Sequence, residues 1–212
     1  TYTVTATSAG LTGSPLTFTA TASAGGATTI ALTSGNSQTD TISNVLALPF
    51  VVTVTDAGGN PVAGRSVTFA IASTPVGATG QSLSILNATT IANGQASSTL
   101  TLGNKVGTYT VTATSAGLTG SPVTFTSTAT VGPATNIALT SGNSQSGTIS
   151  TALAAPFVVT VTDAGGNPIL GRSVTFAIAS TPVGAAGQAL SVVNATTIAN
   201  GQASSTLTLG DK

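Results

Sequence analysis

The chain has 212 residues, of which only 4% are charged; four Lys or Arg balance four Asp or Glu, and His is absent. Soluble domains usually contain about 25% charged residues. A chain with a net charge of zero lacks the positive surface that binding to nucleic acid or to acidic membranes requires, so we expect neither partner. Hydrophobic residues make up 41% of the chain, and Thr or Gly interrupts every apolar run well before the roughly 18 residues of a membrane-spanning helix. These features predict a folded chain that does not insert into membranes.

The residue types on which most enzymes depend are missing. Without His and Cys the chain cannot form a nucleophilic triad or a zinc site. Its acids are all Asp and stand apart in the sequence, whereas calcium needs several carboxylates at one site. We therefore predict that the protein is not an enzyme and binds no metal or cofactor. The four acids are Asp40, Asp56, Asp163 and Asp211.

The sequence repeats itself with a period of 107 residues. Residues 2–10 return as residues 109–117, and residues 50–61 return as residues 157–168. The differences between the copies are mild, such as Leu16 against Val123. A period of domain size predicts tandem domains rather than a solenoid of small units.

Apolar and polar residues alternate with period two throughout one repeat, and no stretch has a helical period. Turn signals separate the strands, among them the Gly-Gly of residues 56–61 and the Asn-Gly of residues 93–94. About seven short strands in roughly 100 residues predict an all-β immunoglobulin-like sandwich. The expected strands are 29–33, 50–55, 66–72, 82–86, 95–102, 107–115 and 123–131. The expected core residues are Phe50, Val52, Val54, Val67, Phe69, Ile71, Leu100, Tyr109, Val111 and Phe125.

Three segments carry a family resemblance: residues 54–69, residues 93–96 and residues 107–113. They resemble the group 1 bacterial immunoglobulin-like domain, which builds the stalks of invasin- and intimin-type adhesins. The resemblance implies an extracellular or cell-surface location. It brings no catalytic residues, because in that family these domains mostly hold another part of the protein away from the cell.

Several residues have predicted structural roles. Asp56 and Asp163 each begin a tight turn, where Asp commonly bonds the backbone two residues on. We expect turn pairs of Asp56 with Arg65 and of Asp163 with Arg172. Tyr109, and Tyr2 in the neighbouring copy, stand where a tyrosine corner would place its hydroxyl against the backbone.

The surface of this chain must be almost uncharged, and two interpretations of it stand open. It either reflects drift of composition in a secreted protein, or it packs against copies of the chain, with lateral bundling, or carries sugar. Two acceptor motifs for N-glycosylation occur, at Asn87 and Asn194.

The repeat also predicts domain boundaries. Residues 27–131 form one complete sandwich, residues 133–212 lack the last two strands of another, and residues 1–24 are the last two strands of a preceding one. Exposed core and a bare sheet edge favour aggregation, so we expect copies to meet head to tail. The copies are either covalently continuous or joined by strand donation.

The predicted function is therefore a structural repeat of an extracellular filament or stalk. The alternative is an adhesin module with a glycan- or ice-binding face formed by the alternating threonines of residues 1–7 and 124–130. Against this alternative, Thr is also a common polar strand former.

Overall fold

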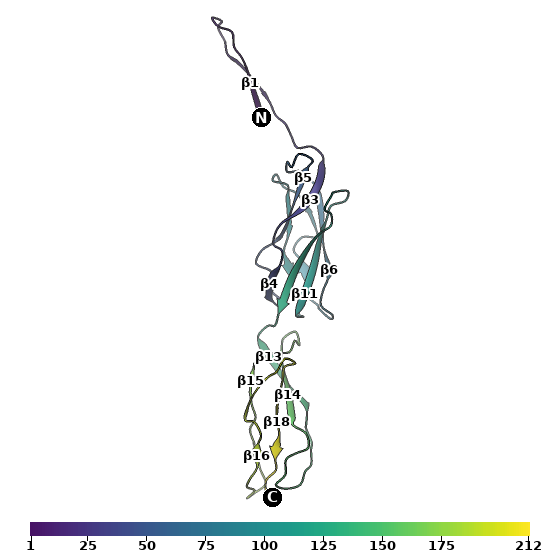
Figure 1. Ribbon diagram of the computed structural model, residues 1–212, viewed down its shortest axis with the longest axis vertical. Coiled ribbons are helices and arrows are strands. Elements are labelled where there is room, and N and C mark those ends of the chain that lie inside the picture. The colour runs from purple at the N-terminus through teal and green to yellow at the C-terminus, as the bar shows by residue number, and fades with distance from the viewer.

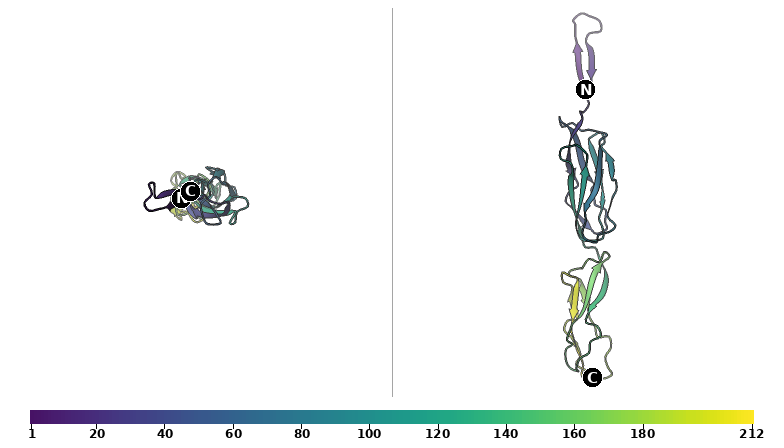
Figure 2. Two further views of the ribbon diagram at one scale, coloured as in Figure 1. Left: turned by 90° about the horizontal axis from the view of Figure 1, so that it is seen from above. Right: turned by 90° about the vertical axis from the view of Figure 1, so that its right-hand side faces the viewer.

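The computed structural model describes all residues 1–212, which form three bodies along one line (Figure 1). The first is a two-stranded hairpin of β1 (Tyr2–Ala6) and β2 (Leu16–Ala20), called here the N-terminal hairpin. The second body, the closed sandwich, contains the strands β3 to β12. The third, the open sandwich, contains the strands β13 to β19. A second view shows the same order along the rod, with the N-terminal hairpin projecting beyond the closed sandwich (Figure 2).

The closed sandwich contains two main antiparallel layers. One sheet has the order β4-β12-β11-β6-β8, in which only the pairing of β12 with β4 is parallel, and the other has the order β3-β5-β9. A short pair, β10-β7, forms a separate two-stranded sheet. The strands are β3 (Ala27–Ser34), β4 (Gln38–Thr41), β5 (Phe50–Asp56), β6 (Ser66–Ser73), β7 (Ser82–Leu83), β8 (Asn87–Thr89), β9 (Gln95–Ser98), β10 (Leu100–Thr101), β11 (Gly107–Thr114) and β12 (Val123–Thr130).

The core of the closed sandwich confirms the period-two pattern. Nineteen buried residues between Ile30 and Ala129 form one cluster. The rings of Phe50 and Phe125 stack across it with centroids 4.7 Å apart. All of the predicted core residues are buried except Ile71, which is only partly buried.

Some strand predictions were wrong in detail. The predicted strand 95–102 is broken into β9, which pairs with β5, and β10, which pairs with β7. The Ser98 hydroxyl donates to the Ile85 carbonyl (2.7 Å) at this break. Two strands were not expected, β4 and β8, because neither has an apolar run of its own. Each is a short edge strand held by a neighbouring long strand.

The open sandwich has the same strand order but fewer paired residues. Its sheets are β13-β14-β18, β15-β17 and β16-β19. The counterpart of β6 shrinks from eight residues to three, and no strand corresponds to β4. Both losses have one cause. In the closed sandwich β6 pairs with β11 and β4 pairs with β12, and the open sandwich has no counterparts of β11 and β12. The strands are β13 (Ala134–Ser141), β14 (Phe157–Asp163), β15 (Ser173–Thr175), β16 (Ala189–Leu190), β17 (Asn194–Thr196), β18 (Gln202–Ser205) and β19 (Leu207–Thr208).

The architecture is therefore all-β and consists of tandem immunoglobulin-like sandwiches, as the sequence predicts. None of its elements is a helix of the length and hydropathy needed to cross a bilayer.

Replacing Phe69 by Ala should lower the free energy of unfolding of the closed sandwich by about 3–5 kcal/mol, because a fully buried ring leaves a cavity. Its counterpart in the open sandwich, Phe176, is only partly buried, so Phe176→Ala should cost clearly less. Denaturant unfolding of the 212-residue chain carrying each change measures the difference. Equal losses would show that the two bodies are equally well packed.

Candidate assembly interface

The N-terminal hairpin has the same strand register as the hairpin that ends the closed sandwich. In the N-terminal hairpin Tyr2 pairs with Ala20 and Val4 pairs with Phe18. In the closed sandwich the residues 107 later pair in the same way, Tyr109 with Ser127 and Val111 with Phe125. The N-terminal hairpin is thus already folded as the last two strands of a sandwich.

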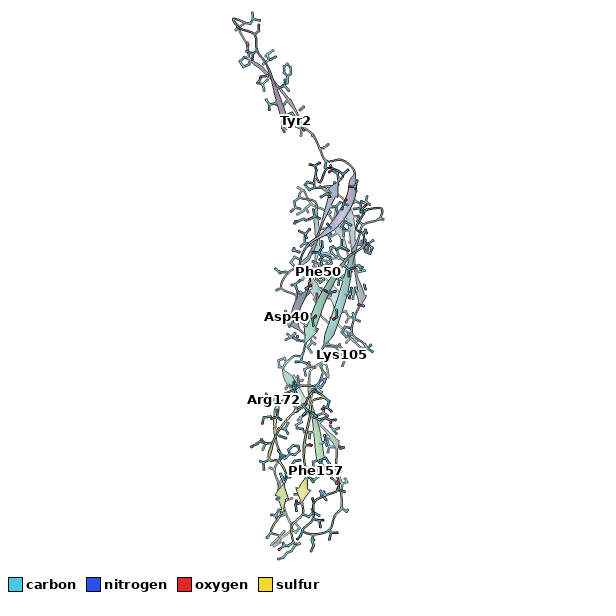
Figure 3. The ribbon with its side chains drawn as sticks, viewed as in Figure 1. Tyr2, Asp40, Phe50, Lys105, Phe157 and Arg172 are labelled. Carbon is cyan, nitrogen blue, oxygen red and sulfur yellow. The ribbon has the colours of Figure 1, made fainter.

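The apolar face of the N-terminal hairpin is uncovered. Tyr2 and Phe18 are 67% and 58% exposed, whereas Tyr109 and Phe125 are completely buried. Figure 3 shows Tyr2 at the base of a hairpin that lies apart from the closed sandwich. Burying one such side chain contributes about 1.5–3 kcal/mol. Burial of this apolar face against another part of the protein is therefore favourable.

The apolar side chains of the open sandwich also lack a cover. Ile137 is 61% exposed and Ile149 is 56% exposed, although their counterparts Ile30 and Ile42 are 1% and 8% exposed. Only four residues form its buried cluster: Val161, Val174, Ala195 and Ala203. Phe157, which Figure 3 shows inside this body, is only half-buried.

A cavity in the open sandwich corresponds to the place that a tyrosine fills in the closed one. It has a volume of about 340 Å³, and Gln188, Leu209 and Gly210 are among its lining residues. In the closed sandwich the counterpart Gly103 is so close to Tyr109 that a Cβ there would lie 2.8 Å from the tyrosine hydroxyl. The cavity is therefore the counterpart of the Tyr109 site.

A polar joint connects the closed sandwich to the open one. The carboxylate of Asp163 accepts hydrogen bonds from the backbone amides of Gly132, Gly165 and Asn167 at 2.9–3.0 Å. It also accepts from the side-chain amide of Asn167. Burial by itself would raise the pKa of Asp163, but these hydrogen bonds outweigh burial and lower it. The turn after β14 is thus built around one ionised carboxylate.

The other half of the joint is the loop that follows β10. The side-chain amide of Asn167 donates to the backbone carbonyl of Asn104 (3.0 Å), and the ammonium group of Lys105 donates to the carbonyl of Gly165 (2.6 Å). The Val106 amide donates to the Asn167 side-chain carbonyl (3.3 Å). A Cβ at Gly165 would lie 1.9 Å from the Asn104 carbonyl oxygen, so only glycine fits there. Lys105 lies at the end of the closed sandwich that faces the open one (Figure 3).

The turn at Asp56 is built in the same way but has no such partner. Its carboxylate accepts hydrogen bonds from Gly25, Gly58 and Asn60. The Gly25 amide has the largest effect, and together these bonds lower the pKa of Asp56 to about 2. Asn60 is exposed, whereas its counterpart Asn167 is 4% exposed.

The predicted pairing of Asp56 with Arg65 is not formed. The Arg65 guanidinium donates to the Ser115 hydroxyl (3.0 Å) and to the Ala116 carbonyl. The predicted pairing of Asp163 with Arg172 is likewise not formed. Arg172 is exposed, and its backbone amide and carbonyl bond the hydroxyl and the amide of Thr197. The reason is that backbone amides already bond each carboxylate: those of its own turn, and that of Gly25 or Gly132.

The remaining predicted residues lie on the sandwiches. The Tyr109 hydroxyl donates to the Lys105 carbonyl (2.8 Å), and burial raises the pKa of this tyrosine. Tyr2, by contrast, is exposed in the N-terminal hairpin. Asn87 and Asn194 are exposed, and each accepts a hydrogen bond from a threonine hydroxyl of the adjacent strand. Their glycosylation stays a prediction.

The acidic side chains and the outward-facing threonines are the remaining candidates for a binding site. No group of three or more Asp, Glu, His or Cys side chains comes together, and Asp40 bonds Asn44 and Thr41, which lowers its pKa. Along β12 the threonines face outward, but the hydroxyl groups of Thr126 and Thr130 donate to Asn36 and to the Asp40 carbonyl. The glycan- or ice-binding alternative stays a prediction.

Comparison with known proteins gives a match to one family model and a set of similar structures. Residues 43–128, less than half of the chain, match the model of the bacterial Ig-like domain (group 1), which confirms the predicted resemblance. No curated protein sequence matches the chain.

Three of the similar solved structures illustrate the range. The D0–D1 domains of intimin are 22% identical, with 86% of this chain and 85% of that chain covered and a TM-score of 0.38. FdeC, an Escherichia coli adhesin, is 24% identical over 93% of this chain and 60% of that chain, with a TM-score of 0.47. The Yersinia pseudotuberculosis adhesin InvE is 19% identical over 84% and 51%, with a TM-score of 0.39.

The low pKa of Asp56 predicts a pH dependence of stability. Because its pKa is lowered to about 2, the carboxylate stabilises the folded chain fully above about pH 4, and this contribution is lost as the pH falls through about 2. Between about pH 4 and about pH 2, the melting temperature of the Asp56→Asn variant should therefore fall less than that of the wild type. Melting curves at a series of acidic pH values measure this, and parallel losses would contradict it.

The close approach at Gly165 predicts a rigid joint. Gly165→Ala should push the Asn104 loop away and widen the distribution of distances between the two sandwiches, because the new Cβ would overlap a backbone carbonyl. Spin labels on cysteines introduced at the exposed positions Ser82 and Thr196 report this distance by pulsed electron paramagnetic resonance. The labelling is specific because the chain has no cysteine of its own.

Gly58→Ala is the matched control, because a Cβ at Gly58 meets only its own turn. It should leave the Ser82–Thr196 distribution unchanged. A wide distribution in the unaltered chain would show that the joint is not rigid.

Proposed function

We propose that this chain is a structural repeat of an extracellular or cell-surface bacterial filament or stalk. Repeats follow each other head to tail, and the N-terminal hairpin of one copy completes the open sandwich of the copy before it. The match to the bacterial Ig-like domain supports this location and role, because the domains of that family serve mostly as spacers.

One observation carries the proposal: the hairpin and the open sandwich are complementary. The hairpin has the register of β11 and β12 and an uncovered apolar face. The open sandwich has no counterparts of β11 and β12 and exposes the side chains that these strands would cover. The hairpin therefore supplies the two strands that the open sandwich is missing, and the open sandwich supplies the core that the hairpin would cover.

The closed sandwich supplies the register of the proposed contact. There, Ala113 pairs with Phe69 and Thr110 pairs with Ser73. The same pairing between copies would set Ala6 against Phe176 and Thr3 against Ser180. It would also place Tyr2 in the cavity lined by Gln188 and Gly210.

The same contacts arise from two modes of continuity. In one mode the open sandwich and the following hairpin belong to a single polypeptide, and in the other a separate chain donates the hairpin. The proposed units are residues 1–24, 27–131 and 133–212 in both modes. Because the contacting surfaces differ, the assembly is an open filament rather than a closed dimer.

Strand donation between separate chains is tested with one apolar residue of the hairpin. Phe18→Asn should abolish self-association of the 212-residue chain, because a polar amide would replace the ring that corresponds to the buried Phe125. Thr17→Asn is the matched control, since its counterpart Thr124 is exposed in the closed sandwich. Sedimentation velocity at increasing protein concentration measures the association.

The wild type and Thr17→Asn should form long species. Phe18→Asn should stay monomeric and should melt at the temperature of the wild type measured at a concentration too low for association. Association of Phe18→Asn equal to that of the wild type would contradict the proposed contact. A wild type that stays monomeric at high concentration would exclude donation between chains.

A further inference from the structure

The chain contains one turn twice, in two different surroundings. The turns of residues 56–61 and 163–168 have the same sequence and the same internal hydrogen bonds to their Asp. The second is covered and its Asn167 is buried, whereas Asn60 of the first is exposed. The cover of the second turn is the loop of Asn104 and Lys105.

The counterpart of that loop is already shaped for the same task. Asn104 is held by two bonds with Thr79, one from the Asn104 amide to the Thr79 carbonyl (3.0 Å) and one from the Thr79 amide to the Asn104 side chain (2.9 Å). Asp211 makes the same two bonds with Ala186, at 3.0 Å and 2.8 Å. The carboxylate thus replaces the side-chain amide oxygen of Asn104 without changing the loop.

Two of the three loop groups that contact the turn have counterparts in Asp211 and Lys212. Asn104 presents its backbone carbonyl to Asn167, and any residue can supply a carbonyl. Lys105 presents its ammonium group to Gly165. Lys212 supplies the same group at the corresponding place and is exposed in this chain.

We propose that the turn of residues 56–61 is a docking site for the Asp211–Lys212 segment of the preceding copy. The side-chain amide of Asn60 donates to the Asp211 carbonyl, and the Lys212 ammonium donates to the Gly58 carbonyl. This inference rests on the proposed head-to-tail order and adds a second contact to it, separate from the apolar hairpin.

The consequence is a filament in which every joint is alike. Strand completion alone would leave the next sandwich attached through a short linker. The docked turn fixes the orientation between sandwiches by hydrogen bonds to backbone groups and one charged side chain, which are directional. Joints within a copy and joints between copies would then have the same angle.

The test uses two copies joined by Val-Gly, the two residues that separate Lys105 from Thr108. Spin labels at Ala189 of the first copy and Thr89 of the second span the proposed joint. These positions correspond to Ser82 and Thr196, which span the joint within one copy. Hydrogen exchange of the Tyr2–Ala6 amides in the second copy reports separately whether the hairpin has completed the first copy's open sandwich.

The two label pairs should give the same mean distance and equally narrow distributions. Gly58→Ala in the second copy should widen only the Ala189–Thr89 distribution, and Gly165→Ala in the first copy should widen only the Ser82–Thr196 distribution. A wide Ala189–Thr89 distribution, or one unchanged by Gly58→Ala, would overturn the docking site. If the hairpin amides are then protected from exchange, the proposed function survives; rapid exchange of these amides would contradict the proposed function itself.

Discussion

The pairing between β11 and β6 is the interaction on which the rest of the structure depends. Where β11 is present, β6 is paired along most of its length and Phe69 and Val111 are buried. Where its counterpart is absent, β15 keeps only three residues and Ile137 is exposed. The closed and open sandwiches have nearly the same sequence, so this difference comes from two strands. The core of each sandwich is therefore complete only when a final hairpin covers it.

A chain with so few charges has to join its domains by other means. The joint uses backbone carbonyls and amides, one buried Asn and one Lys, arranged around a single carboxylate. Each sandwich spends one of its rare acids on this turn, as Asp56 or Asp163. A joint of this kind depends little on the charge of the remaining surface, which is free to consist of Thr, Ser, Asn and Gly. Directional hydrogen bonds between the domains and a nearly uncharged surface are therefore compatible.

The sequence predicted the fold and the core well because both follow from local period-two patterning, as in the strand of Phe50, Val52 and Val54. It predicted the Asp56–Arg65 pair wrongly, since opposite charge near a turn says nothing of the closer amides of Gly25 and Asn60. The joint was missed because Lys105 and Gly165 are far apart in sequence. The only available signal was the repeated Gly-Gly-Asn-Pro turn, which has no partner within its own repeat.

The most direct test of the head-to-tail account is the distance between the Cα atoms of Lys212 in one copy and Thr1 in the next, measured in a structure of assembled copies. Because two residues separate Lys105 from Thr108, three Cα–Cα steps limit this distance to roughly 11 Å. The account predicts a value within that limit, with residues 1–24 paired to the neighbour's open sandwich. A separation well beyond it, or a hairpin folded back onto its own chain, would contradict the account.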